Sequence, residues 1–348
     1  METLPFGVWA ALAGLLAGTV LGLAARLGDF CTLGALESAA YGDDQRRLRL
    51  WGVVLAVAIL GVFLGDAYGL IAVGDTIYHQ IAWNPVASIL GGALFGYGMA
   101  MAGNCGFGAL VRFGGGDLRS LVVVVVMGVF AFVTLSGPLA PLRQALFAQT
   151  EATGPQGITA DLGALTGLAP LAIAAILAAG CLIWALSYAP LRRARKQLAW
   201  GVAAGLAVVW SFAATTWLAE ASFGEIAVEG LSFTAPIGRS LIWLMTSTAG
   251  GISFSVGTVA GVMLGALAGS LARGLFRWEA CEDPRELGRQ VSGAAMMGIG
   301  GVVALGCSVG QGVSAFATLA WSGPVTLAAI AAGALFGLRR LIGGFQPQ

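Results

Sequence analysis

Two of the five cysteines in this 348-residue chain lie in the same glycine-rich pattern. The pattern is G-x-G-x6-C-x-x-G, and its copies occupy 96–108, with Cys105, and 298–310, with Cys307. A thiol is a weak, polarizable hydrogen-bond donor, and glycine allows the backbone to approach a ligand closely. Because the two thiols are 202 residues apart in matching surroundings, the pattern predicts an internal duplication.

A third cysteine, Cys31, lies in the related sequence Phe-Cys-Thr-Leu-Gly at 30–34. Its counterpart in the second half is predicted to be Thr234, which also follows a phenylalanine and replaces the thiol by a hydroxyl. Both segments are too short and too broken to cross a bilayer. We expect them to be re-entrant loops that enter from opposite sides of a membrane.

The composition indicates an all-α polytopic membrane protein. The chain is 58% hydrophobic and 10% charged, whereas soluble domains carry about 25% charged residues. A net charge of +1 gives no basic surface for nucleic acid. The N-terminal sequence lacks the basic region of a cleaved signal, so the first apolar run is expected to be retained.

Apolar runs long enough to cross a bilayer predict nine transmembrane helices. Clusters of basic residues fall in every second loop, and by the positive-inside rule those loops are cytoplasmic. The predicted N-terminus is therefore periplasmic and the C-terminus cytoplasmic. The predicted spans are 6–27, 50–70, 86–104, 119–137, 168–188, 198–217, 250–272, 290–306 and 323–338.

The spans predict one transmembrane domain, 1–348, built from two inverted repeats. Cys105 closes the third span and Cys307 closes the eighth. The two motifs are therefore five spans apart, and an odd number of crossings makes the two copies run in opposite directions through the membrane. We expect pseudo-repeats 1–137 and 198–338, joined by 138–197, in which 138–167 is an outer loop. Inverted repeats with interrupted helices are a recurring design of transporters, and irregular backbone at membrane depth is tolerated where it lines a cavity.

At these residues the chain resembles the YeeE/YedE family of sulfur-transport membrane proteins, whose best understood members take up thiosulfate. The resemblance spans nearly the whole chain and rests on 30–35, the Cys105 pattern, 234–239 and 306–314. It implies that Cys31, Cys105 and Cys307 are the pathway thiols of a monomeric, hourglass-shaped inner-membrane permease. It also implies a small cytoplasmic sulfurtransferase-like partner protein.

The chemistry of thiols suits a dianion such as thiosulfate. A full positive charge in a low-dielectric path would hold a dianion too tightly, whereas neutral S–H donors in series bind weakly enough to release it. Burial in apolar surroundings keeps a thiol neutral. The sequence therefore predicts a relay of weak S–H hydrogen bonds. Further candidate substrate-binding residues, chosen for their donors or charge, are Asn104, Gln311, Ser314, Thr234 and Arg239.

Other classes of function stay open at this stage. Related membrane proteins serve as sensors, and Met101, on one helical face with Cys105, could contribute to a path for Cu(I). A redox enzyme is disfavoured because the chain has neither a C-x-x-C pair nor a cofactor motif, so no cofactor or metal is expected. Cys181 and Cys281 lie outside the motifs, and His79 is predicted to be solvated in an outer loop.

Overall fold

The computed structural model describes residues 5–248, 250–280 and 283–344. Within these ranges the regular structure is helical, apart from two isolated β-bridges, Ile81–Glu151 and Asp117–Glu279. The elements in chain order are α1 (Phe6–Gly28), α2 (Thr32–Tyr41), α3 (Arg46–Ala67), η1 (Val73–Asp75), α4 (Ile77–Gln80), α5 (Pro85–Ala102), α6 (Gly106–Gly114), α7 (Leu118–Leu135), α8 (Ala140–Leu146), α9 (Ile158–Thr166), α10 (Pro170–Leu186), α11 (Ala189–Arg193), α12 (Arg195–Ala221), α13 (Thr234–Thr246), α14 (Phe254–Ala272), α15 (Pro284–Val303), η2 (Gly310–Ala315) and α16 (Ser322–Gly344).

The helices confirm the predicted all-α polytopic membrane protein. Among the described residues, seven helices are long and apolar enough to cross a membrane, or eight if the bent pair α9 and α10 forms one span. Two of these spans are interrupted helices, Phe6–Tyr41 and Pro85–Gly114. A helix lies at each of the nine predicted spans. Helix α15, and α10 without α9, are not among those long and apolar enough to cross a membrane. The count of nine spans and the re-entrant course of the short helices therefore stay predictions.

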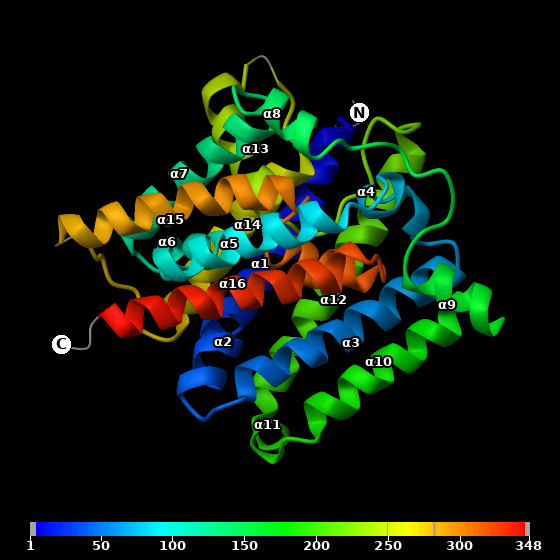
Figure 1. Ribbon diagram of the computed structural model, residues 1–348, viewed down its shortest axis with the longest axis horizontal. Helices are drawn as coiled ribbons and strands as arrows, with labels where there is room; N and C mark the ends of the chain where they lie inside the picture. Colours follow the sequence, from blue (N-terminus) through cyan, green and yellow to red (C-terminus); the bar gives the residue numbers. More distant parts are fainter. Residues whose placement is uncertain (1–4, 249, 281–282, 345–348) are drawn as a thin grey trace.

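The segment 138–167 differs from the predicted outer loop because it contains α8 and α9. Helix α9 turns into α10 through a bend of 112°, and Figure 1 shows this pair at the lower right edge of the molecule. Pro141 stands in the first turn of α8, where a missing N–H costs nothing. The proline that suggested a loop therefore begins a helix.

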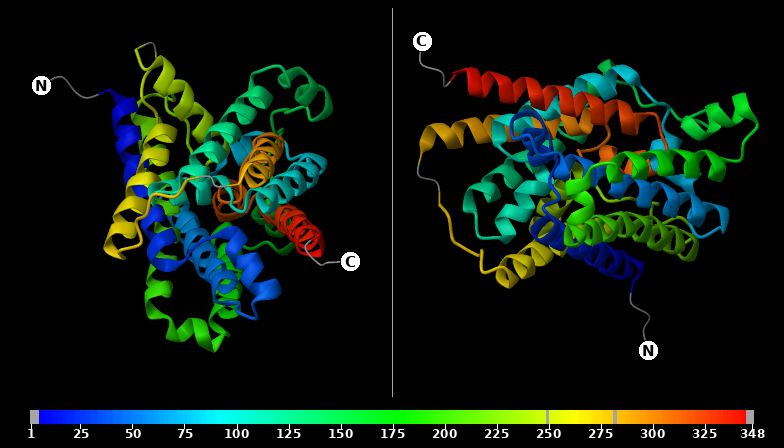
Figure 2. Two further views of the ribbon diagram at one scale, coloured as in Figure 1. Left: turned by 90° about the vertical axis from the view of Figure 1, so that its left-hand side faces the viewer. Right: turned by 90° about the horizontal axis from the view of Figure 1, so that it is seen from below.

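Close backbone packing between small residues assembles the bundle. Helix α1 packs on α14, and α5 packs on both α15 and α16; Figures 1 and 2 show the latter three side by side. A Cβ atom added at Gly18 would lie 2.3 Å from the carbonyl oxygen of Thr258, and one at Gly96 would lie 2.0 Å from that of Ile330. These glycines permit helix contact where lipid supplies no hydrophobic driving force.

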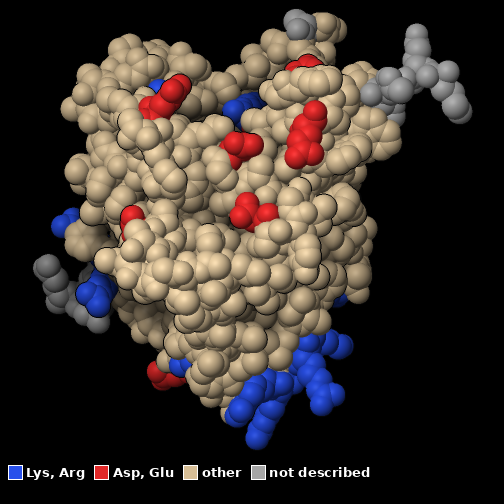
Figure 3. All heavy atoms as spheres, turned by 90° about the vertical axis from the view of Figure 1, so that its right-hand side faces the viewer, with Lys and Arg blue, Asp and Glu red and all other residues tan. Residues whose placement is uncertain are grey.

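Charge is distributed unevenly over the surface. Figure 3 shows one face of the molecule, with acidic side chains scattered over its upper half and a group of basic side chains at its lower edge. Such separation of basic side chains toward one end is what the positive-inside rule describes. The orientation of the chain in the membrane remains the prediction made from the sequence.

Candidate functional site

Three long helices end in the same way, each with a left-handed residue two positions before a cysteine. At each end one residue takes the left-handed conformation, which stops the helix and redirects the chain. Only one of the three is glycine, so the other two adopt a conformation that costs an ordinary residue about 1 kcal/mol. The residues are Asp29 after α1 (φ 57°), Gly103 after α5 (φ 75°) and Leu305 after α15 (φ 59°).

Short helices begin at the thiols. Cys31 is the N-cap of α2, and Cys105 is the N-cap of α6, where its Sγ accepts a hydrogen bond from the Gly108 N–H at 3.3 Å. Both therefore stand where a helix presents unpaired N–H groups and partial positive charge.

Cys307 joins the two helical breaks of the second half. Its Sγ accepts hydrogen bonds from the Gly310 N–H, at the start of η2, and from the Phe233 N–H, at the N-cap of α13, both at 3.3 Å. Element η2 is a π-helical turn, a rare form that is frequently found at functional sites.

The structure brings the three motif cysteines together. The Cys105 thiol is close enough to interact electrostatically with the thiols of Cys31 and Cys307 and with the hydroxyl of Ser308. The Thr32 hydroxyl also donates to Ser308 Oγ at 3.1 Å and ties the Cys31 segment to the Cys307 segment. Cys105 and Cys307 are buried, whereas Cys31 is half-buried. Of the three thiols, that of Cys31 is the most exposed.

The other two cysteines do not belong to this cluster. Cys181 is half-buried on α10 and packs against a separate apolar group that includes Ala174 and Phe63. Cys281 lies outside the described residues.

The predicted polar residues near the thiols are buried, and three retain unused hydrogen-bonding capacity. Asn104 Oδ1, Thr234 Oγ1 and Gln311 Oε1 have no protein partner, which is uncommon for buried polar atoms. Gln311 Nε2 donates to the Leu305 carbonyl at 3.1 Å. Ser314 differs because its hydroxyl already donates to the Leu231 carbonyl at 2.7 Å. Its position between the helix breaks therefore favours a structural role for Ser314.

Arg239 lies apart from the thiols in an ion pair. Its Nη1 is 3.0 Å from Glu229 Oε1 and donates to Ser255 Oγ at 3.2 Å. The side chain is 45% exposed, so its charge is both screened and paired. Of the two roles open to it, this geometry favours anchoring α13 to α14.

Sequence reasoning missed an aromatic cluster around the thiols. The rings of Phe107 and Phe233 have centroids 5.1 Å apart, and Phe107 lies 6.3 Å from Phe30, which stacks on Trp51 at 4.9 Å. Each phenylalanine is adjacent or nearly adjacent in sequence to a helix break, which was the available signal. All three phenylalanine rings are buried.

The loop before α5 closes over η2. The Tyr78 hydroxyl donates to the Gly310 carbonyl at 3.1 Å, and the two ring nitrogens of His79 lie 2.8 Å from the Gln156 carbonyl and 3.1 Å from the Thr318 carbonyl. Burial lowers the pKa of His79, although the carbonyl contacts oppose this shift. The prediction that His79 is solvated was wrong, because its loop packs against the 316–321 turn.

Comparison with known proteins agrees with this architecture. The chain is 26% identical to the thiosulfate transporter TsuA of Escherichia coli (strain K12) over 332 residues, which are 91% of this chain and 90% of that protein. It is 25% identical to the thiosulfate transporter TsuA of Spirochaeta thermophila (strain ATCC 700085 / DSM 6578 / Z-1203) over 322 residues, with 88% and 93% covered. Residues 27–336, which include all three thiols and both glycine motifs, match the model of the Sulphur transport family, and the chain belongs to that family.

Proposed function

We propose that this protein takes up thiosulfate into the cytoplasm through a path that passes Cys307, Cys105 and Cys31. The observation that carries the proposal is the convergence of three thiols, from three separate segments, at the N-termini of short helices. The two relatives named as thiosulfate transporters indicate the substrate. Within the part of the chain that the structure describes, the hydrogen-bond partners of Cys105 Sγ and Cys307 Sγ are uncharged N–H and O–H groups, which suits a dianion that must also leave.

The relay works by exchange of weak hydrogen bonds. Each thiol offers one S–H donor to the terminal sulfur or an oxygen of the anion, and helix N-termini add partial positive charge. The unused Thr234 hydroxyl supplies an ordinary donor. The unpaired atoms of Asn104 and Gln311 are amide oxygens, which accept hydrogen bonds, so these two residues would bind the anion through their NH2 groups; that of Gln311 already donates one bond to the Leu305 carbonyl. Several weak sites in series permit both entry and departure.

A covalent relay is the competing mechanism. In that case a thiolate attacks the terminal sulfur of thiosulfate, a persulfide forms and sulfite leaves. The guanidinium of Arg47 lies beside Gly34, whose added Cβ would be 2.9 Å from Arg47 Nη1 and 3.7 Å from Cys31 Sγ. Cys31 is also the half-buried one of the three thiols, so it is where a persulfide would form. Mass spectrometry of the wild type after turnover tests this: a stable addition of one sulfur would contradict the non-covalent relay.

We also propose that 1–137 and 198–338 are inverted repeats joined by 138–197 within one domain. The helix contacts support this, because a contact between two helices recurs between their counterparts in the other half. Helix α1 packs on α14 as α12 packs on α3, and α5 packs on α16 as α15 packs on α7. The corresponding short helices are α2 and α13.

The proposed protein is a monomer of the bacterial inner membrane, with a periplasmic N-terminus and a small cytoplasmic sulfurtransferase-like partner. Growth of a sulfur-uptake-deficient bacterium on thiosulfate or sulfate, with and without this gene, tests the function. We expect rescue on thiosulfate alone. A sensor would bind thiosulfate without moving it into proteoliposomes. A reporter fused after Gln348 that is active only in the periplasm would overturn the orientation.

A further inference from the structure

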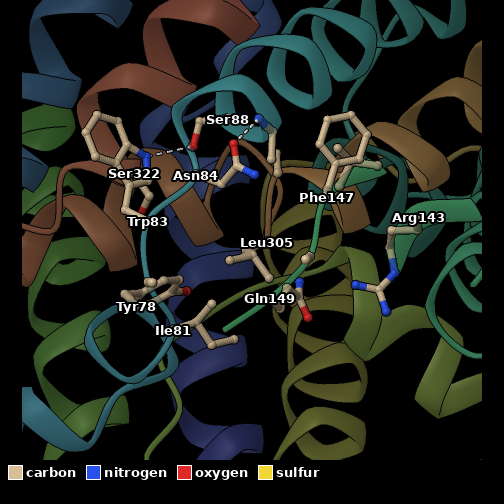
Figure 4. Close-up of a pocket in the computed structure, with 15 residues that line it drawn as sticks. Tyr78, Ile81, Trp83, Asn84, Ser88, Arg143, Phe147, Gln149, Leu305 and Ser322 are labelled. Atoms are coloured by element: carbon tan, nitrogen blue, oxygen red, sulfur yellow. Dashed lines mark hydrogen bonds between the residues drawn. The ribbon is translucent and has the colours of Figure 1, made fainter. Parts of the chain in front are cut away.

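A charged cavity lies apart from the thiols, at the ends of α1, α6 and α14 and the start of α7. No motif cysteine lines it. Its volume is about 170 Å³, whereas the pocket shown in Figure 4, which Tyr78 and Arg143 line, holds about 20 Å³. One water molecule needs roughly 10–15 Å³, so the charged cavity has room for a much larger group. Its charged lining residues are Arg26, Arg112, Asp117, Arg119, Arg277 and Glu279.

The cavity carries an excess of positive charge. Four arginines line it against two carboxylates, so the net charge of its lining is +2. One arginine occupies both carboxylates, because Arg119 lies 3.2 Å from Asp117 Oδ1 and 3.1 Å from Glu279 Oε2. No carboxylate of the described residues lies within 4.0 Å of the other three arginines. This charge distribution favours a negatively charged ligand.

Arg26 reaches the cavity from the last turn of α1. Its guanidinium has five N–H donors, of which Nη2 donates to the Val111 carbonyl at 3.0 Å, while Nε is buried without a hydrogen-bond partner in the protein. A Cβ atom added at Gly115 would collide with the same Nη2, so this glycine makes room for the guanidinium. Partial burial of a cation with unused donors is costly, and an anion that supplies acceptors would offset that cost.

The opposite wall is fixed by backbone hydrogen bonds between two loops. The Arg277 N–H donates to the Gly115 carbonyl at 3.2 Å, and the Glu279 N–H donates to the Gly116 carbonyl at 3.0 Å. The Leu118 N–H in turn donates to the Glu279 carbonyl at 2.9 Å. The chain that follows α14 is therefore held against the start of α7, and the arginines line the cavity before any ligand binds, which lowers the cost of binding.

Exposed apolar side chains border the charged cavity. Leu275, on its wall, is 53% exposed, and Trp278, next to Arg277 in the chain, is 71% exposed. Leu271, in the last turn of α14, is exposed as well. Tryptophan and arginine beside exposed leucine are typical of the boundary between a membrane and water. A small inorganic anion would make no use of this border, whereas a lipid would.

The position of the cavity along the bundle agrees with a lipid headgroup. Helices α1 and α14 end, and α7 begins, at what the distribution of basic loops predicts to be the cytoplasmic boundary. Figure 1 shows the chain between α14 and α15 on the left, the side on which the C-terminus lies. The cytoplasmic leaflet carries anionic lipids, and basic pockets between transmembrane helices on that side bind their headgroups.

We propose that this cavity binds the phosphate headgroup of an anionic phospholipid of the inner leaflet, with its acyl chains beside Leu275 and Leu271. The phosphate contacts the guanidinium groups of Arg26, Arg112 and Arg277. Such a lipid joins α1, α6 and α7 of the first predicted repeat to α14 of the second, and it therefore stabilises the contact between the halves. The inference concerns a site outside the thiol path and does not depend on which substrate the protein transports.

Native mass spectrometry and thermal unfolding of the detergent-solubilised protein test the site with defined lipids. Phosphatidylglycerol should remain bound and raise the melting temperature more than phosphatidylethanolamine, whose ammonium group offsets the phosphate charge. Arg277→Gln should weaken binding of phosphatidylglycerol by at least about tenfold, as expected for loss of one charge-assisted hydrogen bond. Arg26→Gln should do the same. The control is Arg192→Gln, which removes an exposed charge from α11 and should keep the wild-type affinity.

The two arginines differ in their structural roles, so the readout is the shift caused by lipid rather than the melting temperature itself. Arg26 also bonds the Val111 carbonyl, and its loss lowers the stability of the lipid-free protein. If Arg26→Gln does not fold, Arg277→Gln decides, because Arg277 is exposed and its side chain makes no ion pair within 4.0 Å among the described residues.

Three results would overturn the proposal. The first is wild-type affinity for phosphatidylglycerol in Arg277→Gln, or a loss of affinity as large in Arg192→Gln. The second is equal stabilisation by inorganic phosphate or glycerol 3-phosphate at the same concentration, which would make this a site for small oxyanions. The third is capture of an acidic cytoplasmic protein by the lipid-free wild type that Arg277→Gln abolishes, which would assign the surface to a protein partner.

Discussion

Replacing each motif cysteine by alanine should separate the transport role of the thiols from their structural role. All three variants lose an S–H donor, so uptake should fall to background in each. Their stabilities should differ, because the backbone uses the sulfur atoms unequally. Within the described residues, no backbone N–H donates to Cys31 Sγ, one donates to Cys105 Sγ and two donate to Cys307 Sγ. Cys307 Sγ also lies 4.0 Å from Ser232 Oγ, where either atom could donate.

The size of the difference follows from these bonds. A hydrogen bond contributes about 0.5–1.5 kcal/mol, and a buried donor left without a partner costs about 1–3 kcal/mol. Sulfur is a weak acceptor, so about 1 kcal/mol per lost bond is expected from the lower end of that range. Cys105 and Cys307 are equally buried, so the transfer cost of the sulfur cancels between them. Cys307→Ala should therefore be about 1 kcal/mol less stable than Cys105→Ala, and Cys31→Ala should be the most stable.

Thermal unfolding of the three purified variants in one detergent, alongside uptake assays, provides the measurement. Serine should recover part of the stability at position 307, since its oxygen accepts N–H bonds, but it should restore little uptake because its shorter side chain reaches the anion less well. Full uptake by Cys105→Ala or Cys307→Ala would refute the relay. A reversed order of stability would refute the account of the backbone bonds.

Two further predictions concern the backbone and the outer loop. Gly103→Ala should lower stability by about 1 kcal/mol, because a residue with a side chain is strained at the Gly103 φ of 75°. Space is not the reason, since nothing lies within 4 Å of a Cβ added there. Gly180→Ala is the control: Gly180 lies within α10 with equally open space, so this variant should be neutral or stabilising in thermal unfolding. The pKa of His79 is lowered by burial, so its contribution to stability is complete above its unfolded pKa of about 6.5 and is lost as the pH falls through its folded pKa. Melting temperatures between pH 8 and pH 5 should therefore fall more for the wild type than for His79→Gln, and parallel curves would contradict the assignment.

The fold class was predictable because its signal is local, and the role of the three thiols stays a prediction. Hydropathy indicates membrane helices directly, since each such helix must form its own backbone hydrogen bonds and present apolar side chains to lipid. A glycine before Asn104 marks the end of α5 at Gly103, but Asp29 and Leu305 take the same left-handed conformation with no signal in their residue types. At Asp29 and Leu305 the backbone conformation is set by where the next segment packs in the folded protein.

Boundaries and buried charges were less accessible to sequence reasoning. Helix α15 begins at Pro284, after the cap Asp283, six residues before the predicted span, because hydropathy undervalues a helix with charges in its first turns. Arg143 falls in a segment rich in proline and glycine that was expected to be a loop, yet it is almost fully buried. Burial of a single polar side chain depends on what packs over it, and a single sequence does not encode that contact locally.

The proposed path uses weak donors where the anion must pass. Cys105 and Cys307 are buried, so the dielectric around them is low, and a guanidinium at that depth would bind a dianion too tightly to release it. Thiols replace part of the hydration shell of the anion without adding a full positive charge. The use of thiols rather than a cation at this depth therefore follows from the low dielectric.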